Sequence, residues 1–273
     1  MGIRVDGKGI AERLSQTIME AFQAEGLSPR LAVLVMTDDL AIQKFLISKS
    51  NRAQRMGVEI EIIRLPMEYT TKQVIEQIRN AEKSHDGVIL QLPLQPQVDY
   101  IRARNALTVG HDVDVISDAA MDVFRKGGKV FPPVAGAIQA ILEEHHLSLM
   151  GKVVVVVGQG RLVGEPAAIF ALREGAQVTV VTEDTPDIEE HLKRAEVLIL
   201  GAGDPGFLTP DMIRDGVVII DAGTSEAKGK LSGDMDPACA NKAALYTPVP
   251  GGVGPITVAM IFKNLLELAR DAA

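Results

Sequence analysis

Hydrophobic residues gather in short runs along the chain, and amphipathic stretches separate these runs. The runs with the length of β-strands are residues 31–36, 58–65, 87–92, 153–157, 177–182, 197–200 and 217–221. The stretches with helical period are residues 9–26, 40–56, 71–83, 135–146 and 256–273. Strands that alternate with helices are typical of parallel sheets. We therefore expect two α/β units with parallel sheets and a junction near residues 132–150.

The most informative run is Val153–Val157, because a glycine-rich loop follows it directly. Valines without polar alternation are typical of a parallel strand buried on both faces. Gly158, Gly160 and Gly164 allow a sharp turn and a close approach of phosphate to the backbone. Pro166 suits the first turn of a helix, and a helix N-terminus attracts anions. The loop predicts a dinucleotide site, and a purely structural strand–helix turn is the alternative.

An acidic residue supports the dinucleotide interpretation. Glu183 lies 19 residues after Gly164, at the end of the next apolar run. In dinucleotide-binding folds, an acid at about 20 residues accepts hydrogen bonds from a ribose hydroxyl.

Composition narrows the class of protein. The chain has 273 residues, and 28 Lys and Arg against 36 Asp and Glu give a net charge of −8. This balance argues against nucleic acid or an anionic membrane as a partner. No apolar run is long enough to span a bilayer, and residues 1–6 lack the apolar core of a signal peptide. The single Cys239 excludes an internal disulfide and fits a cytoplasmic protein.

Four polar residues in the first half are candidates for chemistry. Lys49 follows Phe45 by four residues, so the two share a helix face, although a lysine there is more often solvated. Gln91 ends an apolar strand and needs polar partners, which the backbone of the following turn would also provide. Asp112 and Asp114 alternate in an extended segment. They face the same way there and could bind a metal or a polar ring, although a solvated turn is more common for such a segment.

The segment Thr247–Thr257 has three prolines and three glycines in eleven residues. We expect it to be neither helix nor central strand. Rigid irregular backbone of this kind often lines a ligand, and a linker is the alternative. The sequence has no HExxH, CxxC, G-x-S-x-G or Walker motif, so we expect neither a metal site nor a hydrolase triad.

Taken together, these motifs resemble the methylenetetrahydrofolate dehydrogenase/cyclohydrolase family. Residues 247–257 match its PVPGGVGPMT signature except at Ile256. The family's VQLPLP, DVDG, GRSxxVGxP, VIDVGIN and GDV blocks are similar, in that order, to residues 91–94, 112–115, 158–166, 220–223 and 233–234. The resemblance extends over nearly the whole chain.

The resemblance implies a folate-binding catalytic domain over residues 1–134 plus 257–273, a Rossmann NAD(P)-binding domain over residues 135–256, and a cleft between them. It implies oxidation of 5,10-methylenetetrahydrofolate to the 5,10-methenyl form by hydride transfer to NAD(P), followed by hydrolysis to 10-formyltetrahydrofolate. It also implies a homodimer. Departures from the family pattern keep two alternatives open, a non-catalytic folate- or nucleotide-binding paralogue and a monofunctional dehydrogenase acting on a related pterin carrier.

By the same resemblance, Lys49 is the central catalytic lysine, Gln91 its hydrogen-bond partner and Asp114 the carboxylate that holds the pterin. The further substrate-binding residues are Phe45, Pro250, Gly251 and Gly252. The cofactor-binding residues are Gly158, Gln159, Gly160, Arg161, Val163, Gly164, Glu183, Asp184, Gly201, Gly223, Gly254 and Thr257.

On the folate side, this sequence departs from the family pattern. Phe45 replaces a tyrosine, which keeps a surface for stacking but removes the hydroxyl. Val115 replaces the glycine of DVDG and narrows the backbone conformations available there. Ser50-Asn51 and residues 131–135 differ as well. The hydride-transfer framework is kept, and the departures bear on the hydrolytic step and on the identity of the pterin.

On the cofactor side, Gln159 and Gly160 stand in place of the arginine and serine of the family block. Glu183-Asp184 replace the basic or hydroxyl residues common after the second strand of this half. Two carboxylates would repel a 2′-phosphate, whereas a free 2′-hydroxyl can donate to one of them. We therefore predict NAD, with NADP as the alternative in which Arg161 reaches a phosphate.

Overall fold

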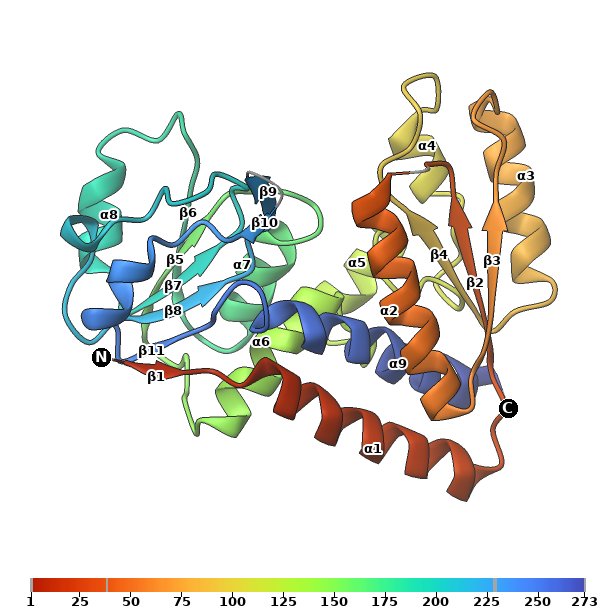
Figure 1. Cartoon of the computed structure of the whole chain (residues 1–273), viewed down its shortest axis with the longest axis horizontal. Coiled ribbons are helices and arrows are strands. Elements are labelled where there is room, and N and C mark those ends of the chain that lie inside the picture. Colours follow the sequence, from red (N-terminus) through yellow and green to blue (C-terminus); the bar gives the residue numbers. More distant parts are fainter. Residues whose placement is uncertain (1, 38, 228–229, 273) are drawn as a thin grey trace. The chain divides into compact units, whose positions relative to one another are not determined.

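The computed structural model describes residues 2–37, 39–227 and 230–272 (Figure 1). The chain forms two compact units. Unit 1 comprises Met1–Ala11 and Val134–Thr257, and unit 2 comprises Glu12–Pro133 and Val258–Ala273. Each unit has its own parallel sheet, which confirms the predicted α/β class.

Unit 2 is built on a parallel sheet with the strand order β3-β2-β4. Its strands are β2 (Arg30–Val35), β3 (Glu59–Arg64) and β4 (Gly87–Gln91). Its helices are α2 (Leu40–Met56), α3 (Thr71–Glu82), α4 (Tyr100–Arg104), α5 (Asp118–Arg125) and most of α1 (Gly7–Glu25) and α9 (Val253–Ala272). The central β2 is apolar throughout, whereas Glu59 and Glu61 alternate in the edge strand β3.

The two faces of this sheet bury different helices. Leu31, Val33 and Val35 pack into a core with residues of α1, α2 and α9. Ala32 and Leu34, which point to the opposite face, pack with residues of α3 and α4. Since successive side chains of a strand alternate between faces, one apolar strand supplies both cores.

Unit 1 has a parallel six-stranded sheet with the order β1-β11-β8-β7-β5-β6. Its strands are β1 (Ile3–Arg4), β5 (Val153–Val157), β6 (Gln177–Val181), β7 (Val197–Leu200), β8 (Val218–Asp221) and β11 (Leu245–Tyr246). The hairpin β9 (Ser225–Ala227) and β10 (Lys230–Ser232) is antiparallel. The helices are α6 (Pro133–Glu144), α7 (Gly164–Arg173) and α8 (Ile188–Arg194), with short 3-10 turns η1 (Pro210–Met212) and η2 (Pro237–Asn241).

One prediction about the proline- and glycine-rich segment is wrong. Helix α9 begins at Val253, inside the segment that we expected to be irregular. Pro255 falls in its first turn, where a missing N–H breaks no helical hydrogen bond. The part before Val253 is irregular, as expected. None of the described helices combines the length and apolarity needed to cross a bilayer.

Asn264 on α9 ties two chain segments of unit 2 together. Its Nδ2 donates to the carbonyl oxygens of Val113 (2.8 Å) and Phe131 (2.6 Å), and its Oδ1 accepts from the Phe131 N–H (3.1 Å). The residue is 1% exposed. The bond to Val113 fixes the backbone immediately before Asp114.

Asn264→Ala should lower the free energy of unfolding by about 3 kcal/mol, because each buried group left without a partner costs about 1–3 kcal/mol. Urea denaturation measures this. Asn80→Ala, on the exposed surface of α3, is the matched control and should change stability by less than about 0.5 kcal/mol. A loss at Asn264 no larger than the control would contradict the structural role.

Candidate functional site

Lys49 and Gln91 meet at the carboxyl edge of the sheet of unit 2. Lys49 lies on α2 and is 8% exposed, and its Nζ donates to Gln91 Oε1 at 2.8 Å. Gln91 is the last residue of β4, and its Nε2 donates to the carbonyl oxygen of Leu92 at 2.9 Å. The second bond fixes the orientation of the amide, so that its oxygen faces the lysine.

Asp114 interacts electrostatically with Lys49. Burial lowers the pKa of Lys49, and the negative charge of Asp114 opposes that shift. Burial likewise raises the pKa of Asp114, and the positive charge of Lys49 opposes it. The lysine therefore gives up its proton more readily than a solvated lysine does. A side chain of this kind can take up or release a proton during a reaction.

Asp112 does not share a binding site with Asp114. It is fully buried, and its carboxylate accepts from the N–H groups of Ile116 (3.2 Å) and Ser117 (2.8 Å). Asp112 therefore fits neither interpretation, a shared ligand site or a solvated turn, because it is buried and holds the turn on which Asp114 sits. The described residues contain no group of three His, Cys, Asp or Glu side chains placed to hold a metal ion.

Phe45 and Val115 depart from the family pattern, and the structure describes the side chain of Val115 only. The side chain of Phe45 lies outside the described part of the structure. Val115 is buried and has φ +54°, in the left-handed region. For a β-branched residue this conformation is strained, at a cost of about 1–2 kcal/mol. The glycine that is usual in the family would avoid the strain, so Val115 places a strained backbone beside Asp114.

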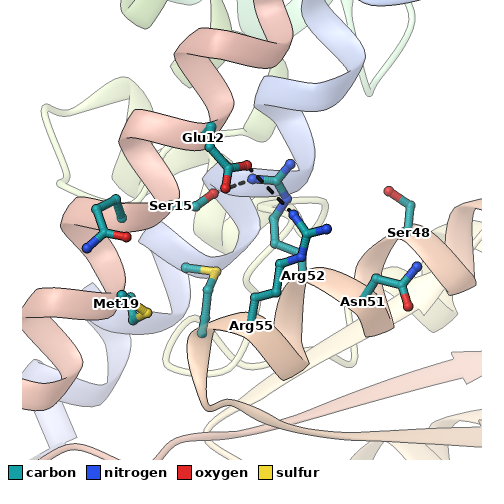
Figure 2. Close-up of a pocket in the computed structure, with 9 residues that line it drawn as sticks. Glu12, Ser15, Met19, Ser48, Asn51, Arg52 and Arg55 are labelled. Carbon is teal, nitrogen blue, oxygen red and sulfur yellow. Dashed lines mark hydrogen bonds and ion pairs between the residues drawn. The ribbon is translucent and has the colours of Figure 1, made fainter.

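A separate pocket of about 320 Å³ lies between α1 and α2 (Figure 2). Arg52 and Arg55 enter it from α2, whereas Glu12 and Ser15 face them from α1. Arg52 donates to the Ser15 hydroxyl, and Arg55 lies 3.9 Å from Glu12. The pocket contains none of the expected site residues. Because it contains none of those residues, we assign it no part in binding substrate.

In unit 1, the glycine loop after β5 is shaped by close backbone contacts. Gly158 has φ +92°, and a Cβ there would lie 2.6 Å from the carbonyl oxygen of Gly201. A Cβ on Gly164 would lie 2.1 Å from the carbonyl oxygen of Gly158. A Cβ on Gly160, in contrast, would meet nothing within 4 Å. Val163, the N-cap of α7, makes no side-chain cap to the helix. The loop thus leaves open space beside a helix N-terminus, which suits a phosphate.

The strand order brings the expected cofactor residues to one edge of the sheet. Strands β5, β7 and β8 are neighbours and parallel, so the loops at their carboxyl ends lie side by side. Gly158, Gly201 and Gly223 are in these three loops. Ligands of open α/β sheets bind at such an edge.

Charged residues near this edge differ in what they contact. Glu183 and Asp184 are exposed in the turn after β6, which a hydrogen bond from the Thr182 N–H to Thr185 Oγ1 (2.9 Å) holds in shape. Arg161 pairs with Glu165 at 2.9 Å. Its positive charge is therefore already balanced within the loop, and Gln159 is exposed beside it.

The remaining residues that we predicted to bind substrate or cofactor lie in the turn that leads into α9 and in the first turns of that helix. Gly251 has φ +105°, and the N–H of Gly252 donates to the carbonyl oxygen of Pro248 at 2.7 Å. The Val249–Pro250 peptide bond is cis. Thr257 Oγ1 donates to the carbonyl oxygen of Gly254 at 2.8 Å. All of these residues belong to unit 1.

Sequence reasoning gave no role to a buried polar cluster at the same edge of unit 1. Asp221, Asp234 and Thr247 are all at most 2% exposed. Burial raises the pKa of Asp221 to about 6, and it also raises that of Asp234. An aspartate that ends an apolar strand was the available signal, because such a carboxylate needs buried donors.

A parallel sheet with a glycine turn at its carboxyl edge is typical of the class of dinucleotide-binding α/β proteins, and here it is joined in one chain to a second α/β unit that holds a buried lysine. Comparison with protein families narrows the class. Residues 5–114 match the catalytic domain of tetrahydrofolate dehydrogenase/cyclohydrolase, and residues 132–273 match its NAD(P)-binding domain. The chain belongs to this family.

Individual relatives are similar over their whole length. The bifunctional protein FolD of Methanoculleus marisnigri is 34% identical over 271 residues, covering 97% of this chain and 96% of that protein. The crystal structure of the FolD methylenetetrahydrofolate dehydrogenase/cyclohydrolase of Campylobacter jejuni covers 100% of both chains, with a TM-score of 0.95 and 27% identity. The Trypanosoma brucei enzyme, complexed with NADP cofactor and inhibitor, has a TM-score of 0.93 and 28% identity, covering 99% of this chain and 98% of that one.

The strain at Val115 predicts a reversed order of stability for two substitutions. Val115→Gly should be more stable than Val115→Ala by about 1 kcal/mol, because glycine relieves the left-handed strain. At a buried position with ordinary φ the order is the opposite, since glycine is worse than alanine by about 0.5–1 kcal/mol. Denaturant unfolding of both variants decides between them, and a more stable alanine variant would refute the strain.

Proposed function

We propose that the protein oxidises 5,10-methylenetetrahydrofolate to the 5,10-methenyl form with NAD(P), and then hydrolyses the product to 10-formyltetrahydrofolate. The observation that carries this proposal is the buried Lys49, hydrogen-bonded to Gln91 and electrostatically coupled to Asp114, in the unit that matches the family's catalytic domain. The bifunctional relatives support both steps.

Each residue of this group suits one task. The edge of a pterin presents adjacent N–H donors, which a carboxylate such as Asp114 accepts bidentately. Lys49, with its lowered pKa, moves a proton when water attacks the cationic methenyl carbon and when the ring opens. Gln91 keeps its oxygen on the lysine and so orients the ammonium or amine group.

The cofactor site proposed in unit 1 fits a dinucleotide. Gly160 leaves open space in the loop that leads into α7, where the positive end of the helix dipole favours the negative charge of a pyrophosphate. We place Gly158, Gly164, Gly201 and Gly223 around the nucleotide. When bound, the nicotinamide accepts the hydride from the substrate's methylene carbon.

We infer further that NAD is preferred to NADP. Glu183 and Asp184 are exposed at the turn where the adenosine ribose would lie, and Arg161 is paired with Glu165. A 2′-phosphate would meet two carboxylates there and no unpaired arginine from the loop. The T. brucei relative binds NADP, so the preference rests on these residues of the present chain alone.

We also propose a cytoplasmic homodimer. The buried free thiol of Cys239 suits a reducing compartment. Among the described residues, strand β6 pairs only with β5 and ends the sheet of unit 1, and Val180 on this strand is 41% exposed. An unpaired edge with apolar side chains is a surface that a second copy can cover.

Lys49→Met should lower the rate of methenyltetrahydrofolate hydrolysis at least about 100-fold, because it removes the group that moves the proton. The wild-type rate should rise with pH to a plateau, because the reactive form of Lys49 is the neutral amine. The pH of half-maximal rate should lie below the ordinary pKa of lysine. Lys72→Met, on the exposed face of α3, is the control and should keep the wild-type rate. Wild-type hydrolysis by the Lys49 variant would refute the role of Lys49. Absence of both activities in wild-type protein that binds folate would select the non-catalytic paralogue.

Activity with NAD and NADP at matched concentrations tests the nucleotide preference. We expect kcat/KM to be at least about tenfold higher with NAD, which corresponds to about 1.4 kcal/mol. The double substitution Glu183→Arg and Asp184→Ser should shift the ratio toward NADP, because it replaces two negative charges by one positive charge. A wild-type preference for NADP would overturn the assignment.

A further inference from the structure

We propose that Asp234 is a positioning residue for the nucleotide site, holding the loop 201–203 against the glycine loop 158–164. This inference rests on the proposed dehydrogenase function and adds a residue that makes no contact with the reacting atoms. Asp234 is fully buried and lies in the segment of chain between β10 and η2.

The first observation is the pair of bonds that Asp234 makes to the loop after β7. Its Oδ2 accepts from the N–H groups of Ala202 (2.8 Å) and Gly203 (3.1 Å). The carbonyl oxygen of Gly203 accepts from Ser225 Oγ at 2.7 Å. Both ends of this peptide segment are therefore held from outside its own loop.

The second observation is that this loop directly supports the glycine turn. The space beside Gly158 Cα is closed by the carbonyl oxygen of Gly201, 2.6 Å from where a Cβ would be. The space beside Gly201 is closed by Val163 Cγ1 at 2.3 Å. A displacement of residues 201–203 would therefore change the surface on which both Gly158 and the N-cap of α7 rest.

The third observation is that a second carboxylate holds Asp234 in place. Asp221 Oδ1 accepts from the N–H groups of Gly223 (3.0 Å) and Asp234 (3.3 Å), and its Oδ2 accepts from Met235 N–H (2.9 Å). The N–H of Asp221 in turn donates to Thr247 Oγ1 at 2.7 Å. The loops after β7, β8 and β10 and the chain after β11 are thus joined by one network of hydrogen bonds.

The two carboxylates also fill the spaces left by two glycines. A Cβ on Gly223 would lie 2.2 Å from Asp234 Cγ, and a Cβ on Gly233 would lie 2.2 Å from Asp221 Oδ2. Each carboxylate therefore packs on the backbone of the segment that carries the other. This reciprocal packing leaves Asp234 no room to release the loop by rotating away.

Neither Asp221 nor Asp234 forms an ion pair with a described residue, and Asp234 Oδ1 is buried without a hydrogen-bond partner, so backbone N–H groups compensate their burial only in part. Two adjacent buried carboxylates are costly, because each disfavours ionisation of the other. The network places this cost at the edge where the nucleotide is proposed to bind. A positioning role explains why two buried carboxylates lie there, since their hydrogen bonds to fixed N–H groups specify a single loop geometry.

The test compares Asp234→Ala with Asp234→Asn. Alanine removes the acceptor of both loop bonds, and we expect the dissociation constant and KM for the preferred nucleotide to rise at least about tenfold. Hydrolysis of methenyltetrahydrofolate needs no nucleotide, so its kcat should stay within about twofold. Asparagine retains an oxygen that can accept both N–H groups, and it should restore most of the affinity. Asp236→Ala, which removes a carboxylate that caps η2 by accepting from Ala238 N–H, is the matched control and should leave nucleotide binding unchanged.

The outcomes separate this inference from the proposed function. Unchanged nucleotide binding in Asp234→Ala, or equal losses in the alanine and asparagine variants, would overturn the positioning role while wild-type turnover still supports the function. Wild-type protein that neither binds nucleotide nor oxidises the folate would overturn the function itself, and this inference with it. Should Asp234→Ala fail to fold, Ser225→Ala, which loosens the same loop from its other end, should raise the nucleotide KM about two- to threefold. No change in that variant would count against the inference.

Discussion

Burial of the central strands on both faces is the constraint on which the rest of the structure depends. β2 and β5 carry almost no polar side chains, because helices or other core residues cover each face. Polar chemistry can then occur only where the strands end. In unit 2 the end of β4 supplies Gln91, and in unit 1 the ends of β5, β7 and β8 supply the glycine turn, the supporting loop and Asp221.

The two strand edges handle buried charge differently. In unit 2, Lys49 and Asp114 carry opposite charges, so each opposes the pKa shift that burial causes in the other. In unit 1, Asp221 and Asp234 carry like charges, and backbone N–H groups are the donors to both, although Asp234 Oδ1 has no hydrogen-bond partner. The first arrangement keeps a proton exchangeable, which suits a group that reacts. The second fixes backbone positions, which suits a group that supports a ligand site without reacting.

The regular elements could be predicted from sequence where apolar runs were long and uninterrupted. The strands over residues 153–157 and 197–200 are found with the predicted bounds. Helices α4, α5 and α8 were not predicted, since they have only five to eight residues and are too short to show a clear helical period. Their capping residues were a usable signal for α4 and α5, because Asp99 and Ser117 accept from the N–H groups of Arg102 and Ala120.

The residues of the candidate site could be predicted from sequence where a motif contains them. The contacts that each residue makes could not be predicted. The resemblance singled out Lys49 and Gln91, but only the fold brings Nζ and Oε1 within 2.8 Å. The resemblance also places Asp112 and Asp114 in one motif, whereas Asp112 is buried and accepts hydrogen bonds from the N–H groups of Ile116 and Ser117. The difference follows from local backbone direction, since Val115 adopts a left-handed conformation that lets the chain turn back to place Ile116 and Ser117 N–H on Asp112. A valine at that position pays for the turn with strain that a glycine would avoid. Since its neighbour Asp114 is the residue expected to hold the pterin, this strain lies in the backbone that sets the position of the substrate's carboxylate partner.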